Sequence, residues 1–245
     1  MKTCAERHRS DATHGFIMHM TAIGFDFDHT LGVDNGLERE AFYRYAEELG
    51  RPLDRKDPLV HERIEKLLLR FRSGSITLHE TARLFGEWLG LAADVERYRE
   101  ICYSLVDELV RPVDGARETI AALREQGVRM AILTNGWTPL QQMKIARALG
   151  EDAIEPVLVS DALNALKPAR EAFDALVAAL GVDRSDVWYV GDNPVTDIGG
   201  ALAAGLRAVW FDWEGLKYPA DIPPPTLRIT TLRELETLVE NTTAP

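Results

Sequence analysis

The sequence has few cysteines and no long apolar run. Its only two cysteines, Cys4 and Cys102, are too few for a disulfide framework. We therefore expect free thiols in a reducing cytoplasm. No stretch approaches the roughly 20 apolar residues that a transmembrane helix needs, so we expect no membrane partner. Residues 1–20 lack the apolar centre of a secretory signal and show no periodicity, which predicts a disordered leader.

Positive charge is also scarce. The 28 Lys and Arg residues face 39 Asp and Glu residues, which gives a formal net charge of -11. Such a field repels polyanions, so it argues against a nucleic-acid polymer as partner but not against a small anionic ligand. With 46% hydrophobic residues, the 245-residue chain can form one core plus a smaller lobe, as a monomer or a homodimer.

Short apolar runs alternate with helical patterns along most of the chain. The runs are TAIGFDF, VRMAILT, PVLVS, VWYVGD and RAVWFD, with a last short strand in LRIT. The patterns between them are GARETIAALREQG, LQQMKIARALG, PAREAFDALVAALG and TDIGGALAAG. Nearly continuous apolar strands are typical of a parallel sheet that is covered on both faces. The alternation predicts an α/β fold with a doubly wound, Rossmann-like parallel sheet.

Residues 35–111 interrupt this alternation with four successive amphipathic helical patterns. These patterns are LEREAFYRYAEELG, VHERIEKLLLRFRSG, TLHETARLFGEWLG and VERYREICYSLVDELV. We expect an inserted all-helical cap domain at 35–111, and a core domain built from residues 21–34 and 112–245.

Polar clusters follow the predicted strands in four places. In chain order they are DFDHT, TNG, LKP and GDNPVTD. In open α/β sheets the ligand site lies beyond the carboxyl ends of the strands, so these clusters should converge on one edge. Their density of carboxylates indicates Mg²⁺, which prefers oxygen ligands and commonly bridges protein carboxylates to a phosphate. The cofactor we expect is Mg²⁺, and the chemistry is phosphoryl transfer on a small phosphorylated metabolite.

The first cluster contains two aspartates one residue apart, Asp26 and Asp28. One carboxylate can attack phosphorus and form an aspartyl-phosphate. A second carboxylate two positions on can project to the same side, protonate the leaving oxygen and later act as base on water. We therefore predict Asp26 as nucleophile and Asp28 as general acid and base.

The four clusters, in this order, resemble the motifs of the haloacid dehalogenase (HAD) superfamily of hydrolases. The resemblance runs from DFDHTL through ILTN and Lys167 to GDNPVTD, and covers roughly residues 21–238. It implies that Asp26 is also a Mg²⁺ ligand and that Asp28 binds the metal through its backbone carbonyl. The helical insert resembles a type 1 cap, which closes over the site and excludes water.

The same resemblance implies roles for the later motifs. Thr134 and Asn135 would bind the phosphate, and Lys167 would orient the nucleophile and neutralise phosphate charge. Asp192 would be a Mg²⁺ ligand, and Asp197 would support the metal site directly, through water or through Lys167.

Within the superfamily, three segments are similar to the pyrimidine 5'-nucleotidase branch, whose members dephosphorylate nucleoside monophosphates. They are LTNGWTPLQQMKIARALG, VSDALNALKPAREAFDAL and FRSGSITLHETA. N-acylneuraminate-9-phosphatases and phosphoglycolate phosphatases share much of this pattern, and His29 departs from it. A 2-haloacid dehalogenase, a phosphomutase and a non-catalytic binding module remain alternatives. Trp137, beside the phosphate-binding motif, is either a base or sugar contact or a packing aromatic.

Overall fold

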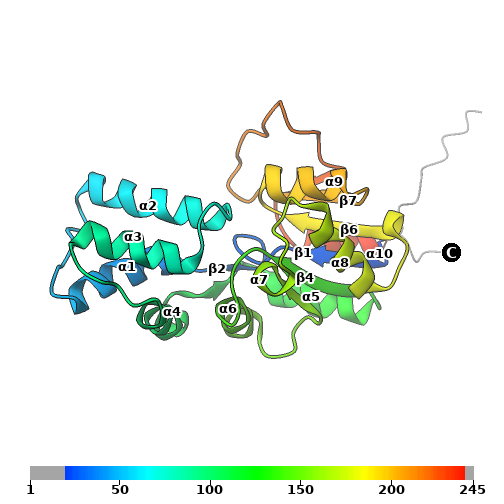
Figure 1. The fold of residues 1–245 in the computed structure, drawn as a ribbon. Coiled ribbons are helices and arrows are strands. Elements are labelled where there is room, and N and C mark those ends of the chain that lie inside the picture. Colours follow the sequence, from blue (N-terminus) through cyan, green and yellow to red (C-terminus); the bar gives the residue numbers. More distant parts are fainter. Residues whose placement is uncertain (1–19, 241–245) are drawn as a thin grey trace, which may run out of the picture.

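The computed structural model describes residues 20–240, which form a core lobe and a smaller helical lobe (Figure 1). The strands of the core are β1 (Ala22–Phe25), β4 (Arg129–Thr134), β5 (Val157–Val159), β6 (Val187–Gly191), β7 (Arg207–Phe211) and β8 (Leu227–Ile229). Its helices are α5 (Ala116–Glu125), α6 (Leu140–Leu149), α7 (Ser160–Leu163), α8 (Arg170–Leu180), η1 (Arg184–Asp186), η2 (Pro194–Gly199), α9 (Gly200–Ala203) and α10 (Glu234–Glu240). Residues 1–19 lie outside the described residues, so the disordered leader stays a prediction. Met20, the last residue assigned to that leader, is buried in the core.

The core sheet has the strand order β5-β4-β1-β6-β7-β8, and every pair of neighbours is parallel. Strand β1 lies inside the sheet, where Phe25 is opposite both Ile132 of β4 and Val190 of β6. The carboxyl ends of all these strands therefore meet at one edge. The predicted doubly wound parallel sheet is confirmed.

Helices cover both faces of this sheet, which explains why its strands are apolar along their whole length. In β6, Trp188 and Val190 belong to the cluster that includes side chains of α5, α6 and α10. The alternate residues Val187 and Tyr189 pack with side chains of α8 and α9 on the other face. Because successive side chains of a strand point to opposite faces, a sheet buried on both sides shows no polar alternation.

The inserted lobe, called the cap below, is all helical, as expected. It contains α1 (Leu37–Glu48), α2 (Pro58–Arg72), α3 (Leu78–Leu89) and α4 (Val95–Leu109). Helix α3 begins with a capping box, in which Thr77 and Glu80 each accept a hydrogen bond from the other's backbone N–H. At the centre of the cap, the Phe42 ring contacts the rings of Phe85 and Tyr98, with centroids 4.5 and 4.6 Å apart. The cap therefore has an aromatic centre of its own.

Two short strands connect the cap to the core. They are β2 (Gly32–Val33) and β3 (Arg111–Pro112), which pair antiparallel. Beside this ribbon, Asp34 Oδ2 accepts a hydrogen bond of 2.9 Å from Lys144 Nζ of α6. Lys144 is only 3% exposed, so the ion pair is a buried link between the start of the cap and the core.

The cap also packs on the core through α4 and α6. The Trp137 ring, just before α6, lies 5.5 Å from that of Tyr103 and 5.7 Å from the Arg99 guanidinium, both on α4. Trp137 is buried in this contact, which agrees with the packing alternative for this residue. Among residues 20–240, no helix is both long and apolar enough to span a bilayer.

The Asp34–Lys144 pair predicts a specific loss of stability in acid. Burial acts to raise the pKa of Asp34, but the Lys144 ammonium outweighs it and lowers the pKa to about 2. A carboxylate whose pKa is lower in the folded state stabilises the fold above its unfolded pKa and loses that contribution as pH falls. Between about pH 5 and about pH 2, the wild type should lose about 2 kcal/mol more unfolding free energy than Asp34→Asn.

Denaturant unfolding at several pH values measures this difference. Asp107→Asn is a matched control, because it removes an exposed carboxylate that pairs with Arg147. Exposed ion pairs contribute little, so this control should follow the wild-type pH dependence. Parallel pH profiles for the wild type and Asp34→Asn would contradict the prediction.

Candidate active site

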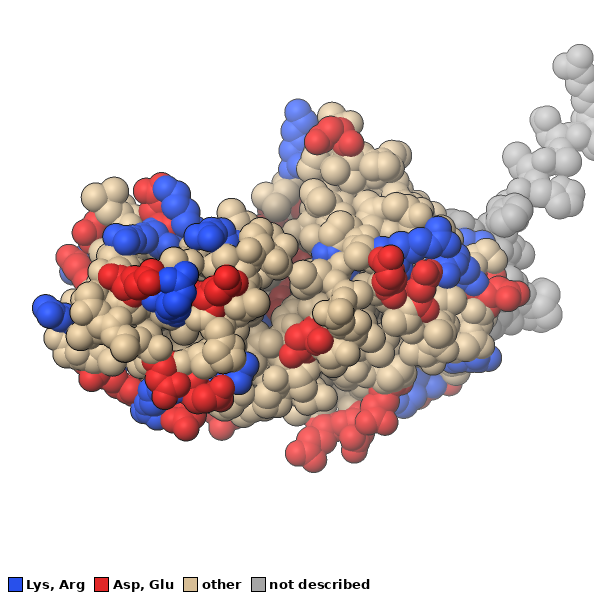
Figure 2. Space-filling view, viewed as in Figure 1, with Lys and Arg blue, Asp and Glu red and all other residues tan. Residues whose placement is uncertain are grey.

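The polar clusters that follow the strands come together at the carboxyl edge of the sheet. The space-filling view shows a cleft between the cap and the core, with acidic side chains at its floor (Figure 2). The structure gathers Asp26, Lys167, Asp192 and Asp197 on this edge, from three separate segments of the chain.

Lys167 is the central side chain of the site. Its Nζ donates hydrogen bonds to Asp26 Oδ1 at 2.6 Å, Asp197 Oδ1 at 2.8 Å and the Tyr189 hydroxyl at 2.9 Å. The three protons of an ammonium group match these three acceptors. Burial opposes the charged form, but the carboxylates of Asp197 and Asp26 raise the pKa of Lys167 well above its usual value. Lys167 is therefore a fixed cation beside Asp26.

Asp192 adds a third carboxylate to this group, whereas Lys167 is the group's single ammonium. Asp26, Asp192 and Asp197 each place a carboxylate oxygen within 4.8 Å of the others. Burial, together with the charges of Asp26 and Asp197, raises the pKa of Asp192 to about 8. Burial likewise raises the pKa of Asp26 to about 7, although Lys167 acts to lower it.

This donor set fits a hard divalent cation. Three carboxylates and one ammonium leave the buried group with a net negative charge, which is costly unless a cation compensates it. All the available donors are oxygens, as Mg²⁺ prefers, and no thiol or imidazole is among them. The acidic cluster can therefore bind a metal ion of this type.

The local fold brings Asp197 against Lys167. The side chain of Asn193 caps η2 by accepting from Val195 N and Thr196 N, and Asp197 Oδ2 accepts from Asn193 N at 3.0 Å. A Cβ atom on Gly191 would lie 2.5 Å from the side chain of Asp197. Glycine at the end of β6 is therefore what lets this carboxylate approach the strand.

The side chain of Asn135 positions the segment that carries Lys167. Its Nδ2 donates to the Lys167 carbonyl at 3.0 Å, and its Oδ1 accepts from Lys167 N at 2.8 Å. The amide thus pairs with both backbone groups of Lys167. One of the two Nδ2 protons of Asn135 remains for a phosphate. Thr134 is buried at the end of β4, and its hydroxyl accepts from Gln141 Nε2 at 2.8 Å.

Asp28 lies apart from this carboxylate group and is held by α6. Its Oδ2 accepts from Gln141 Nε2 at 2.8 Å, and its Oδ1 accepts from Lys144 Nζ. Gln141 Nε2 also donates to Thr134 Oγ1 at 2.8 Å, which places Asp28 and Thr134 around one amide. Gln141 and Lys144 were not singled out from the sequence. The available signal was two polar residues three positions apart on the buried side of a helix.

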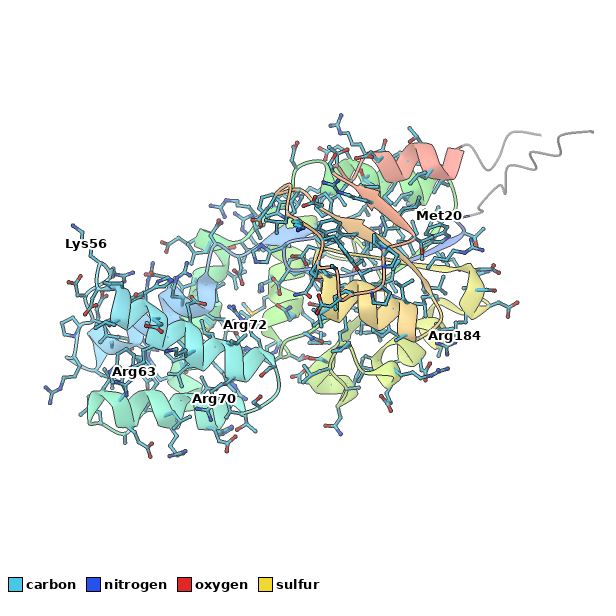
Figure 3. All side chains as sticks on the ribbon, turned by 90° about the horizontal axis from the view of Figure 1, so that it is seen from above. Met20, Lys56, Arg63, Arg70, Arg72 and Arg184 are labelled. Atoms are coloured by element: carbon cyan, nitrogen blue, oxygen red, sulfur yellow. The ribbon has the colours of Figure 1, made fainter. Side chains whose placement is uncertain are left out.

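The cap contributes one cation on the side facing the core. Arg72, at the end of α2, lies between the two lobes (Figure 3). Burial opposes its charge, but Glu38, Asp34 and Asp28 raise the pKa of Arg72. Its Nε and Nη2 donate to Glu38 Oε2 at 2.9 and 2.8 Å, so it is fixed within the cap. Arg72, like Tyr189, was not singled out from the sequence.

Known proteins share both this sequence pattern and this fold. The chain is 31% identical over 176 residues to the pyrimidine 5'-nucleotidase YjjG of Escherichia coli, covering 71% of this chain and 77% of that protein. It is 35% identical over 209 residues to a phosphoserine phosphatase of Thermus thermophilus, covering 81% of this chain and 80% of that one. The HAD-hydrolase YfnB of Bacillus subtilis, solved with bound magnesium, has a similar fold. Its TM-score is 0.72 at 23% identity, over 90% of this chain and 99% of that one.

A family model for haloacid dehalogenase-like hydrolases matches residues 20–205, which include every predicted site residue. With this match, and with the order of its motifs along the sheet edge, the chain belongs to the haloacid dehalogenase-like hydrolases.

Proposed function

We propose that this protein is a Mg²⁺-dependent phosphatase that hydrolyses a small phosphomonoester through an aspartyl-phosphate on Asp26. The observation that carries the proposal is the buried Lys167 between Asp26 and Asp197, with Asp192 beside them. This group combines a carboxylate nucleophile, a fixed cation for phosphate charge and an acidic pocket for a divalent metal.

Asp26 and Asp192 would hold Mg²⁺, together with the backbone carbonyl of Asp28, and Asp197 would support them. When bound, the cation would neutralise charge on the phosphate and let the clustered carboxylates stay ionised. Lys167 shares this task at a fixed position, while Thr134 and Asn135 bind the remaining phosphate oxygens.

The reaction proceeds in two displacements at phosphorus. A carboxylate oxygen of Asp26 forms a bond to phosphorus as the bond to the leaving oxygen breaks, and Asp28 gives that oxygen its proton. Asp28 then takes a proton from water, whose oxygen attacks phosphorus and releases Asp26 and inorganic phosphate. Asp28 can serve in both steps because proton donation in the first leaves it as the base for the second.

We propose a nucleoside 5'-monophosphate as the substrate. Support comes from the similarity to a pyrimidine 5'-nucleotidase over most of the chain, and the relative named phosphoserine phosphatase makes phosphoserine the second substrate to test. N-acylneuraminate 9-phosphate and phosphoglycolate are further candidates. Phosphate release from uridine 5'-monophosphate (UMP), phosphoserine and these two compounds, compared by kcat/KM, tests the assignment.

Hydrolytic dehalogenation would leave some of these side chains without a role. A halide leaves without a proton, so Asp28 would have no acid role, and the acidic pocket around Asp192 would have no metal-dependent task. The buried negative charge at Asp26, Asp192 and Asp197 therefore favours the phosphatase.

Metal dependence should appear in stability as well as in turnover. Burial raises the pKa of Asp26 to about 7 and that of Asp192 to about 8, above their unfolded values. Without metal, the unfolding free energy should therefore fall as pH rises from about 5 to about 8, because the folded state must then hold buried carboxylates ionised.

Adding Mg²⁺ should raise Tm, and more at pH 8 than at pH 6. EDTA should abolish phosphate release and Mg²⁺ restore it, while Asp192→Asn should lose most of the metal-dependent gain in Tm. A Tm that ignores Mg²⁺ at both pH values, with full activity in EDTA, would refute the metal assignment.

Two substitutions separate nucleophile from acid. Asp26→Asn removes the attacking oxygen, so turnover and the acid-labile phosphoenzyme should both disappear. Asp28→Asn should slow phosphoenzyme formation from an alkyl phosphate by ~10²–10⁴-fold, the usual contribution of general acid catalysis.

With p-nitrophenyl phosphate, whose leaving group is a weak base, this Asp28→Asn defect should shrink. Rapid-quench measurement of the phosphoenzyme with UMP and with p-nitrophenyl phosphate gives the comparison. Equal slowing with both substrates would mean that Asp28 is not the acid.

A further inference from the structure

Two segments at the carboxyl edge of the core, η2 and the loop after β7, expose large apolar side chains beside the site. The large hydrophobic side chains that residues 20–240 expose are Leu59, Leu69, Met143, Val195, Trp213 and Leu216. Val195 lies in η2, between Asp192 and Asp197 of the acidic segment, and Trp213 and Leu216 follow β7. These three side chains are 52%, 45% and 59% exposed. The other exposed apolar residues are scattered singly over the surface, which is normal for a folded protein.

Trp213 faces a second ring, that of His29, which belongs to the loop that carries Asp28. The rings of Trp213 and His29 are nearly parallel, with an interplanar angle of 12° and centroids 6.5 Å apart. That separation lies at the wide end of the range for aromatic pairs, so the two rings overlap little. His29 immediately follows Asp28, the proposed acid that meets the leaving oxygen. An aromatic pair therefore lies next along the chain to the proposed acid.

Hydrogen bonds on both sides hold the backbone that carries these rings. Asp212 is buried, and its carboxylate accepts from Leu216 N at 2.7 Å and from Arg228 Nε at 3.0 Å, which ties down the loop that carries Trp213. His29 has a left-handed backbone with φ 61°, and its N–H donates to the Gly32 carbonyl at 2.7 Å. The backbone on both sides is thus ordered before any ligand binds, which lowers the entropic cost of stacking.

The chemistry of this surface selects among leaving groups. A Trp–His pair offers flat π faces and no carboxylate or guanidinium, so it suits a planar heterocycle better than the charged amino acid of phosphoserine. Stacking of a base on an aromatic side chain is tolerant of base identity, because every base has a π face.

We propose that Trp213 and His29 form a subsite that stacks the base of a nucleoside monophosphate, which deepens the proposed function and rests on it. The Figure 1 view places the β7–β8 loop, in orange, on the side of the core that faces the cap. The base would therefore lie at the mouth of the cleft, while its phosphate lies at the carboxylate group.

Ribose 5-phosphate is the matched probe, because it keeps the phosphate and the sugar of UMP and lacks the base. Trp213→Ala should lower kcat/KM for UMP about tenfold, mainly through KM, and leave ribose 5-phosphate unchanged. Trp213→Phe should restore most of the UMP value. His29→Asn, which removes the ring but tolerates a positive φ, should act in the same direction.

Leu59→Ala is the control, because it removes an exposed apolar side chain of the cap and should change neither substrate. An equal loss with UMP and ribose 5-phosphate, or no loss with either, would overturn the subsite. Equilibrium binding of UMP and of ribose 5-phosphate, measured with the full-length wild type and with Trp213→Ala, tests the subsite independently of turnover. If the protein hydrolyses no phosphomonoester, the proposed phosphatase activity is refuted. Binding still decides the subsite in that case: a Trp213-dependent preference for UMP supports the subsite, and the absence of that preference refutes the subsite.

Discussion

The site depends on one buried ammonium group with three acceptors. Lys167 is 4% exposed and ion-paired to Asp26 and Asp197, so removing any one partner would leave buried charge uncompensated. This constraint explains the surrounding backbone. Asn135 holds the Lys167 peptide, Gly191 gives Asp197 room to approach, and the central position of β1 places Asp26 between the strands that carry the other motifs.

The same arrangement occurs a second time, around the other aspartate of the first motif. Lys144 is buried and paired to Asp28 and Asp34, as Lys167 is paired to Asp26 and Asp197. The two lysines come from different parts of the core. Lys144 binds the carboxylate of Asp28, and Lys167 binds that of Asp26. Asp26 is thereby joined to the carboxylates of Asp192 and Asp197, and Asp28 to Asp34 at the start of the cap. Neighbours in the sequence thus have different electrostatic surroundings.

Sequence patterns predicted the elements of the fold because burial imposes them locally. The apolar runs around Phe25 and Val190 are strands covered on both faces, and the segments between Leu37 and Leu109 carry amphipathic stripes with their own caps. The motif residues Asp26, Lys167 and Asp192 could be grouped in advance because parallel strands end at one edge.

Contacts that depend on the orientation of a helix could not be predicted in this way. Gln141 and Lys144 appear in the sequence as polar residues of an amphipathic helix, and only the packing of α6 beneath the first motif turns them toward Asp28. Arg72 becomes part of the cleft only through the fold of the cap. The pairing of Trp213 with His29 joins residues far apart in the sequence, through loops that have no periodic signal.

The attachment of the cap limits how the cleft can change shape. The β2–β3 ribbon and the α4–α6 contact join the lobes along one side of the cleft, and the end of α2 and the β7–β8 loop face each other across its opening (Figure 1). A rotation that keeps the joined side intact moves the opening most and the carboxylate group least. A cap movement of this kind would therefore change the space at the rim of the cleft, while the charges at its floor stay in place.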